Sequence, residues 1–222
     1  MALFCLLHGA WHDAWCWTPL GEQLQELGHA TLAPELPFDD PGADFEERVL
    51  PAVRALEGGA EPAVVVAHSM ASTYAPLVSA RAQVSLTVHL CGRLGFLDTS
   101  ADAPGPFRSG IPFPSERADG TTVWDARLAT ETLYAHLSVD TAAELARRLR
   151  PLAPAADAYP ACDTSATAAL IYTTDDEIFE PSWQRRMAAE LHTEPIELPG
   201  GHFPMLERPR ELAEVLDGLS PA

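Results

Sequence analysis

The sequence predicts an α/β fold in which a sheet of parallel strands is flanked by helices. Short apolar runs alternate with longer amphipathic stretches along most of the chain, which is the order of strands and helices in βαβ units. The run AVVVA at residues 63–67 is continuous and β-branched, as expected for a strand buried on both faces. The length of 222 residues suits one such domain.

Composition excludes several classes of function. The chain is 47% hydrophobic and 21% charged, which is typical of a folded protein. It carries 14 Lys and Arg against 32 Asp and Glu, a formal charge of −18. Such a surface repels phosphate backbones and anionic lipids, so we expect neither nucleic-acid nor membrane partners. No apolar run approaches the roughly 20 residues of a spanning helix.

Six short apolar runs predict the strands of the sheet. They cover residues 2–7, 30–33, 63–67, 85–90, 168–172 and 196–198.

The amphipathic stretches between these runs predict helices. We expect Thr18 to cap the first helix, with Pro19 at its first position. The others are predicted at residues 45–57 with an interruption at Pro51, at residues 69–82 with a kink or early end at Pro76, and after Pro181 and Pro209.

Residues 93–166 break the alternation of strands and helices. Residues 98–120 are rich in Pro, Gly, Asp and Ser, no clear strand is present, and residues 124–150 have a helical pattern. A connection of about 70 residues is too long for a plain crossover. The sequence therefore predicts a core of residues 1–92 and 167–222, with residues 93–166 forming a small helical lid over the carboxyl edge of the sheet.

The strongest local signal for chemistry is AVVVAHSMAS at residues 63–72. A buried strand followed by a sharp turn and a helix is the setting of a nucleophile elbow, which places small residues two before and two after its serine. Ser69 has alanine at both positions, Ala67 and Ala71. The alternative is that Ser69 only caps the helix that follows.

The second signal is the turn after the first apolar run, LHGAW at residues 7–11. A glycine turn leaves backbone N–H groups free to stabilise a developing oxyanion. We expect His8 to bond the backbone of this loop, because no acidic partner is evident. His12 either lines a pocket or is an ordinary loop histidine.

An acid and a histidine follow the last two predicted strands. Asp175 and Asp176 come directly after the fifth run, and a loop with two glycines presents His202 after the sixth. The alternatives are a solvated acidic loop and a surface histidine. Ligands bind at the carboxyl edge of open parallel sheets, and the order serine, acid, histidine is that of the α/β-hydrolase triad.

The motifs HGAWHDAWCW (8–17), AHSMA (67–71), DEIF (176–179) and GGHFPML (200–206) resemble those of the α/β-hydrolase superfamily. The resemblance covers nearly the whole chain. It is most like the small-esterase branch, which includes plant methylesterases, hydroxynitrile lyases and bacterial relatives. The resemblance implies an α/β-hydrolase fold with six parallel strands and no antiparallel leader pair.

The same resemblance implies roles for five residues. Ser69 aligns with the nucleophile, Asp176 rather than Asp175 with the acid, and His202 with the base, while Ala10 and Met70 align with the two backbone oxyanion donors. The implied activity is a serine esterase that cleaves a small, uncharged or apolar carboxylic ester or lactone through an acyl-enzyme. This chemistry needs no metal and no organic cofactor.

Two other functions remain open. Hydroxynitrile lyases of the branch use a lysine after the histidine and a threonine in the H-G turn, where this chain has Phe203 and Gly9. The second open function is that of a non-catalytic ligand receptor or biosynthetic scaffold. The main observation in its favour is that alanine flanks the elbow on both sides. Ala135 and His136 stand where relatives more often carry an acid, which leaves substrate preference open.

Six residues are candidates for a substrate pocket: Trp11, His12, Trp124, Leu128, Tyr134 and Phe203. For the lid residues Trp124, Leu128 and Tyr134 the alternative is packing between lid and core, and for Trp11 it is a place in the core. The four cysteines, Cys5, Cys16, Cys91 and Cys162, form no C-x-x-C pair. They suit reduced, buried thiols and a cytoplasmic protein. The apolar start is interpreted as a strand and not a signal peptide. The oligomeric state is open, a homodimer being one alternative.

Overall fold

The computed structural model describes residues 1–94, 105–155 and 167–220. Its centre is a six-stranded sheet in the order β2-β1-β3-β4-β7-β8, and every neighbouring pair is parallel. The strands are β1 (Leu3–Leu7), β2 (Ala30–Leu32), β3 (Ala63–His68), β4 (Val84–Leu90), β7 (Ala168–Thr173) and β8 (Ile196–Leu198). The prediction of six parallel strands is confirmed.

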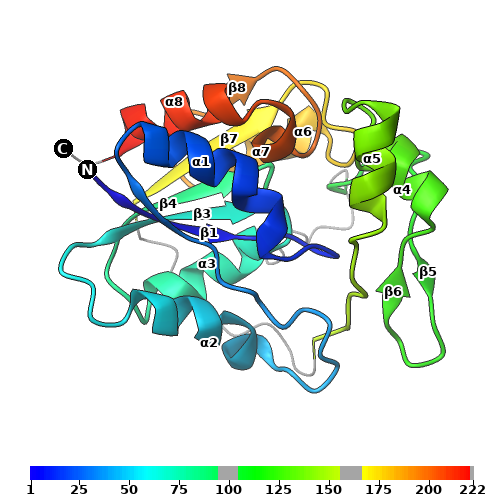
Figure 1. Ribbon diagram of the computed structural model, residues 1–222, viewed down its shortest axis with the longest axis horizontal. Coiled ribbons are helices and arrows are strands. Elements are labelled where there is room, and N and C mark those ends of the chain that lie inside the picture. The colour runs from blue at the N-terminus through cyan, green and yellow to red at the C-terminus, as the bar shows by residue number, and fades with distance from the viewer. Residues whose placement is uncertain (95–104, 156–166, 221–222) are drawn as a thin grey trace.

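Helices cover both faces of the sheet (Figure 1). Helices α1 (Thr18–Glu26) and α8 (Pro209–Leu219) lie on one face, and α2 (Phe45–Leu56), α3 (Ala71–Ser79) and α6 (Pro181–Glu190) lie on the other. Side chains alternate along β1 accordingly: Phe4 and Leu6 join the first layer, while Cys5 and Leu7 join the second. The core is therefore two apolar layers with the sheet between them.

The predicted helix boundaries need three corrections. Thr18 is the first residue of α1 and not its cap, because a 3₁₀ turn over Ala14–Trp17 leads directly into the helix. Helix α2 continues through Pro51, and α3 continues through Pro76 before it ends at Ser79. Buried apolar side chains along α2 and α3 hold both helices together despite the missing proline N–H.

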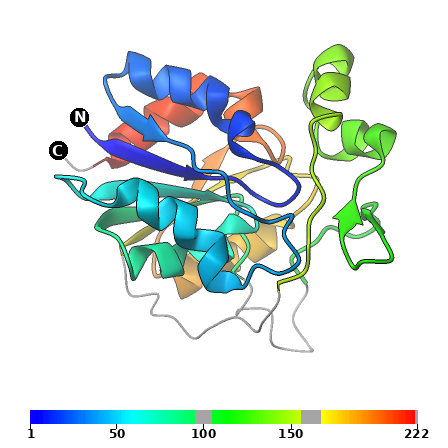
Figure 2. The same cartoon turned by 60° about the horizontal axis from the view of Figure 1, so that its bottom comes forward.

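A segment inserted between β4 and β7 stands beyond the carboxyl ends of the strands (Figures 1 and 2). Its described part, residues 105–155, is called the inserted segment. It contains an antiparallel pair, β5 (Ser115–Glu116) and β6 (Thr122–Val123), and the helices α4 (Ala126–Thr132) and α5 (Val139–Ala146). The expectation of no strand here is wrong, because two-residue strands are too short to produce a period of two. Residues 95–104 and 156–166 of the predicted lid lie outside the described residues.

A buried arginine ties the end of the inserted segment to the core. Arg48 of α2 is 1% exposed and donates to the carbonyl oxygens of Ala153 (3.2 Å) and Pro154 (2.7 Å). It also donates to the hydroxyl of Tyr74 at 3.3 Å. Each of these bonds satisfies part of a guanidinium that would be costly to bury alone.

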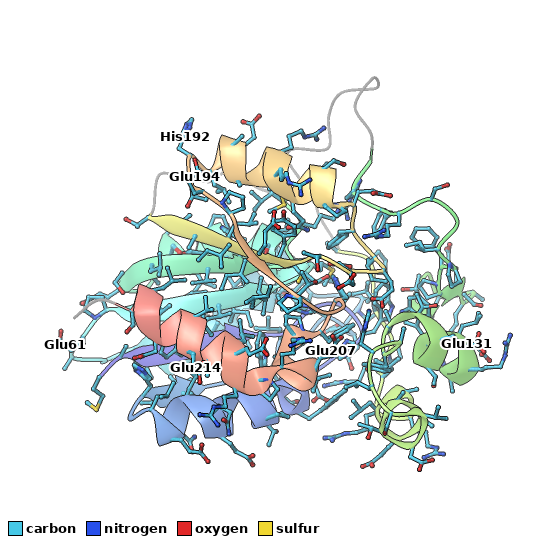
Figure 3. The ribbon with its side chains drawn as sticks, turned by 90° about the horizontal axis from the view of Figure 1, so that it is seen from above. Glu61, Glu131, His192, Glu194, Glu207 and Glu214 are labelled. Carbon is cyan, nitrogen blue, oxygen red and sulfur yellow. The ribbon has the colours of Figure 1, made fainter. Side chains whose placement is uncertain are left out.

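Acidic side chains lie at several separate places on the described surface. Glu131 of α4 and Glu214 of α8 are exposed, as are Glu61 and Glu194 in the loops before β3 and β8 (Figure 3). Among the described residues, no helix has the length and apolar character needed to cross a bilayer. Cys5, Cys16 and Cys91 are free and buried, as expected, while Cys162 lies outside the described residues.

Candidate active site

The turn between β3 and α3 forms a strained elbow at Ser69. Strand β3 ends at His68, α3 begins at Ala71, and Ser69 between them has a φ of 52°, a left-handed conformation that is rare for a residue with a side chain. The cap of α3 is Met70, and no side chain bonds the first turn. Ser69 is therefore not the cap of α3, and its hydroxyl does not bond the first turn of that helix.

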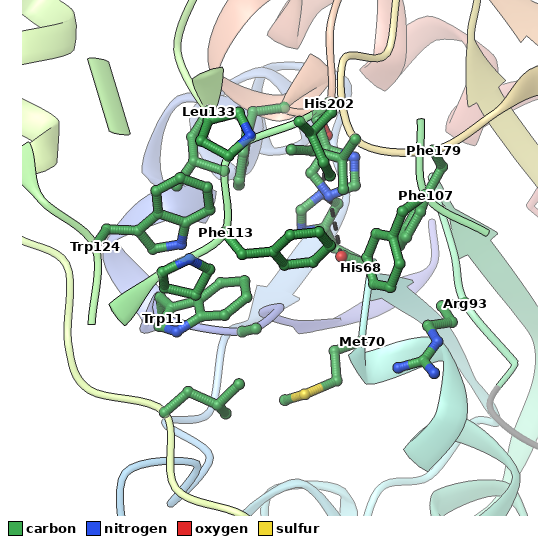
Figure 4. Close-up of a pocket in the computed structure, with 18 residues that line it drawn as sticks. Trp11, His68, Met70, Arg93, Phe107, Phe113, Trp124, Leu133, Phe179 and His202 are labelled. Atoms are coloured by element: carbon green, nitrogen blue, oxygen red, sulfur yellow. Dashed lines mark hydrogen bonds between the residues drawn. The ribbon is translucent and has the colours of Figure 1, made fainter. Parts of the chain in front are cut away.

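The hydroxyl of Ser69 meets the two other predicted residues in one hydrogen-bonded chain. His202 Nε2 accepts from Ser69 Oγ at 3.0 Å (dashed in Figure 4), and His202 Nδ1 donates to Asp176 Oδ2 at 2.9 Å. The exposed fractions of Ser69, His202 and Asp176 are 9%, 3% and 1%. Three residues far apart in sequence thus meet at one edge of the sheet, beyond the carboxyl ends of β3, β7 and β8, with β4 between β3 and β7.

The carboxylate of Asp176 is fixed on both oxygens. Oδ1 accepts from the backbone N–H of Ile178 (2.7 Å) and of Phe179 (3.0 Å), which leaves Oδ2 for His202. The neighbouring Asp175 is exposed and accepts instead from the Thr174 hydroxyl. The preference for Asp176 over Asp175 agrees with this geometry, and Asp176 does not lie in a solvated loop.

The loop that presents His202 is held by two side chains that the sequence did not single out. Glu207 accepts from the N–H of Gly201 at 2.7 Å and from that of Phe203 at 3.4 Å, on either side of the histidine. The hydroxyl of Thr173, at the end of β7, donates to the Gly201 carbonyl at 2.8 Å. Because the Thr173 bond spans 28 residues and the Glu207 bonds depend on how the loop folds back, no pattern in the sequence indicates these roles.

Gly201 in this loop has no room for a side chain. A Cβ there would lie 2.4 Å from His136 Cδ2 and 2.9 Å from Glu177 Oε2. His136 Nε2 of the inserted segment lies 2.5 Å from Glu177 Oε1, so the inserted segment contacts the core beside the loop. Burial raises the pKa of the Glu177 carboxyl. The departure noted at position 136 therefore faces an acid supplied by the core.

His68, next to the nucleophile candidate, supports the same loop from the opposite side. Its Nε2 donates to the backbone carbonyl of His202 at 2.9 Å, and the two rings lie 4.8 Å apart. Burial and the neighbouring His202 lower the pKa of His68 well below its ordinary value. His68 is therefore neutral, and adds no charge next to His202.

The H-G turn after β1 packs directly against this elbow. A Cβ on Gly9 would lie 2.9 Å from His68 Nδ1 and 3.0 Å from Ser69 Cβ, so only glycine fits there. His8 bonds the backbone as predicted: its Nε2 accepts from the N–H of Leu36 at 2.9 Å, and its Nδ1 donates to the Gly9 carbonyl at 3.0 Å. Because Gly9 C=O and Ala10 N–H belong to one peptide, His8 also orients that N–H.

Ala10 and Met70 both line the cavity above Ser69. Among the backbone hydrogen bonds of the described residues, none is donated by the N–H of Ala10 or of Met70. Backbone N–H donors that are free of other acceptors near a nucleophile can stabilise a developing oxyanion.

The cavity is small, with a volume of about 120 Å³, compared with roughly 300–1,000 Å³ for sites that hold drug-sized ligands. Trp11, Trp124 and Phe203 line it as predicted, whereas His12, Leu128 and Tyr134 do not. Its walls are mainly apolar and aromatic (Figure 4). The lining residues that were not predicted as pocket residues include Arg93, Ile111, Pro112, Pro114, Leu152, Ile178 and Phe179.

Cys91 lies beside the same residues. Ligand atoms of Cys91, Asp176 and His202 fall within 4.8 Å of one another. Burial raises the pKa of the Cys91 thiol well above its ordinary value, which opposes the thiolate that a metal ion needs. Asp176 and His202 also bond each other. The geometry fits the chain that ends at Ser69 better than a metal site.

Buried neutral histidines make the stability of the protein depend on pH. Burial lowers the pKa of His8 and His89 to about 4 and that of His12 to about 3. Between those values and about 6.5 the unfolded chain binds protons that the folded chain does not, so stability falls as the pH drops. We expect the free energy of unfolding to be lower at pH 5 than at pH 7 by about 2 kcal/mol for each of these histidines.

Thermal or urea unfolding at pH 5, 6 and 7 measures this effect. His89, in β4, lies outside the site, so His89→Leu should reduce the pH dependence by about one proton. An unfolding free energy that stays constant over this range would contradict the prediction.

Residues 6–215 match the model of the alpha/beta hydrolase family. No match was found among curated proteins.

Solved structures share the fold over nearly their whole length. Polyneuridine aldehyde esterase is 20% identical with a TM-score of 0.81, covering 100% of both chains. A methylesterase from Arabidopsis is 18% identical with a TM-score of 0.72, covering 99% of this chain and 98% of that one. A pyrethroid hydrolase is 16% identical with a TM-score of 0.79, covering 99% and 97%. At these identities the likeness establishes the fold, and with the family match it confirms the resemblance seen in the motifs: the chain belongs to the alpha/beta hydrolase family.

Proposed function

We propose that the protein is a serine esterase, in which Ser69 attacks an ester carbonyl and forms an acyl-enzyme. The observation that carries the proposal is the buried chain of hydrogen bonds from Ser69 through His202 to Asp176. His202 Nε2 takes the proton of the hydroxyl, and Asp176 holds the ring in the tautomer that leaves Nε2 free. Water activated by His202 then releases the acid.

The N–H groups of Ala10 and Met70 stabilise the tetrahedral oxyanion in this proposal. His8 supports one of them by fixing the peptide that carries the Ala10 N–H. The other N–H, that of Met70, is placed by the elbow and by the start of α3. Removing one such donor in comparable enzymes lowers kcat by about 10²–10³.

The substrate that fits best is a small, uncharged or apolar ester or lactone. The cavity of about 120 Å³ and its aromatic walls support this choice. Residues 93–166 act as the lid in this proposal, with Phe107, Phe113 and Trp124 of the inserted segment contributing to the walls. Structural neighbours named as esterases and hydrolases agree with the reaction class.

A lyase is less well supported than an esterase. The lyases of this branch use a lysine directly after the histidine. This chain has Phe203 at that position, and its ring packs against His68 and His202. The 14 basic residues of the chain are all arginines. Gly9 occupies the position of the lyase threonine, and a side chain there would collide with the elbow.

Covalent labelling tests the proposal directly. A fluorophosphonate reacts only with an activated serine, so we expect the protein to be labelled on the peptide that contains Ser69. We also expect hydrolysis of p-nitrophenyl acetate and no benzaldehyde from mandelonitrile. Absence of both label and hydrolysis would favour a binding protein, and benzaldehyde release would favour the lyase.

A further inference from the structure

We propose that Tyr134 of the inserted segment and His12 form a relay that positions the oxyanion-binding turn at Ala10. The proposal rests on the proposed function and adds two positioning residues that do not touch the cavity. It makes the inserted segment a support of the reaction site as well as its cover.

His12 joins the turn to the inserted segment through both of its ring nitrogens. Nδ1 lies 2.8 Å from the carbonyl oxygen of Ala10, and Nε2 lies 2.8 Å from the hydroxyl of Tyr134. A carbonyl only accepts, so Nδ1 carries the proton and Nε2 accepts from the tyrosine. Burial lowers the pKa of His12 to about 3, and this neutral tautomer is therefore the one present at neutral pH.

The relay completes the restraint of Ala10. His8 fixes the peptide before Ala10 through the Gly9 carbonyl, and His12 fixes the peptide after it through the Ala10 carbonyl. Trp11 follows with a φ of 60°. A non-glycine residue keeps this conformation only where its surroundings hold it. Loss of the second restraint would let the turn relax and move the Ala10 N–H.

Two further bonds show that the inserted segment is built onto this turn. The N–H of Arg150 donates to the Trp11 carbonyl at 2.8 Å, and the indole of Trp11 donates to the Thr122 hydroxyl at 3.0 Å. Tyr134 is 1% exposed, so its hydroxyl is held by packing and has His12 as its partner. Both bonds are made to Trp11, so the inserted segment holds the residue that directly follows Ala10.

Tyr134→Phe removes only the hydroxyl of the relay. We expect kcat for p-nitrophenyl acetate to fall about tenfold with KM within twofold, since a displaced donor costs less than the 10²–10³ of a deleted one. Phenylboronic acid, which forms a tetrahedral adduct with the serine, should bind about tenfold more weakly, while planar benzamide should bind as before. Hydrogen exchange of residues 8–13 should become faster.

Tyr172→Phe is the matched control, because it removes another buried tyrosine hydroxyl, one that bonds Glu197 away from the turn. It should change none of the three measurements. In a protein that already carries His12→Asn, adding Tyr134→Phe should lower kcat by less than a further twofold, because the tyrosine acts through His12.

Unchanged kcat and boronate affinity in folded Tyr134→Phe would overturn the relay, and so would equal losses for boronate and benzamide. Failure of the esterase proposal has a different signature: the parent itself would neither bind the boronate covalently nor hydrolyse the ester. Hydrogen exchange reports on the turn even in that case.

Discussion

Ser69→Ala is expected to lower kcat for ester hydrolysis by a factor on the order of 10⁵–10⁶. The substitution removes the hydroxyl that bonds His202 Nε2 and leaves the imidazole and Asp176 in place. Without an acyl-enzyme, only attack by water assisted by the oxyanion donors remains. Single-turnover and steady-state assays with p-nitrophenyl acetate on the purified variant measure the loss.

Ser72→Ala provides the matched control. Ser72 is a buried serine in the first turn of α3, and its hydroxyl donates to the Ala67 carbonyl at 3.0 Å without reaching the cavity. Ser72→Ala removes the same kind of hydroxyl three residues away without touching the cavity, so kcat should stay within a few-fold of the parent. Ser69→Ala with parental activity, at a similar melting temperature, would exclude Ser69 as the nucleophile.

The strands and the meeting point of the site could be predicted because both depend on local pattern and on topology. Continuous β-branched runs such as 63–67 mark buried strands in any parallel sheet. Once the strands are placed, their carboxyl ends meet at one edge, and Ser69, Asp176 and His202 must approach one another there.

The supports of the site could not be predicted, because their roles depend on the folded geometry of the loops and on contacts such as that between Tyr134 and His12, 122 residues apart. Glu207 has the appearance of an ordinary helix glutamate in the sequence, yet its carboxylate bonds the backbone on both sides of His202. Tyr134 and His12 were candidates for the pocket lining, but neither is among the residues that line the cavity, and they bond each other. Tyrosine and histidine, which are both aromatic and polar, suit a cavity wall as well as a buried hydrogen-bonded position, and only the folded packing shows which position they occupy.

Asp176→Asn is expected to lower kcat on the order of 10⁴-fold, through the tautomer of His202. Oδ1 of Asp176 accepts from two backbone N–H groups, so the amide of asparagine must place its oxygen there and its NH₂ group at the Oδ2 position. That NH₂ group would face His202 Nδ1 and force it to accept. The ring proton then moves to Nε2, which can no longer take the proton of Ser69.

Asp175→Asn separates this effect from a general loss of negative charge. Asp175 is adjacent, exposed and bonded to Thr174 and Gly200 rather than to His202. Its variant should keep kcat within a few-fold of the parent, while both variants lose one charge. A proton resonance on His202 Nδ1 in the parent, displaced to Nε2 in Asp176→Asn, would identify the tautomer by NMR. An Asp176→Asn protein as active as Asp175→Asn would show that His202 does not need this carboxylate, and the proposed proton transfer would have to be abandoned.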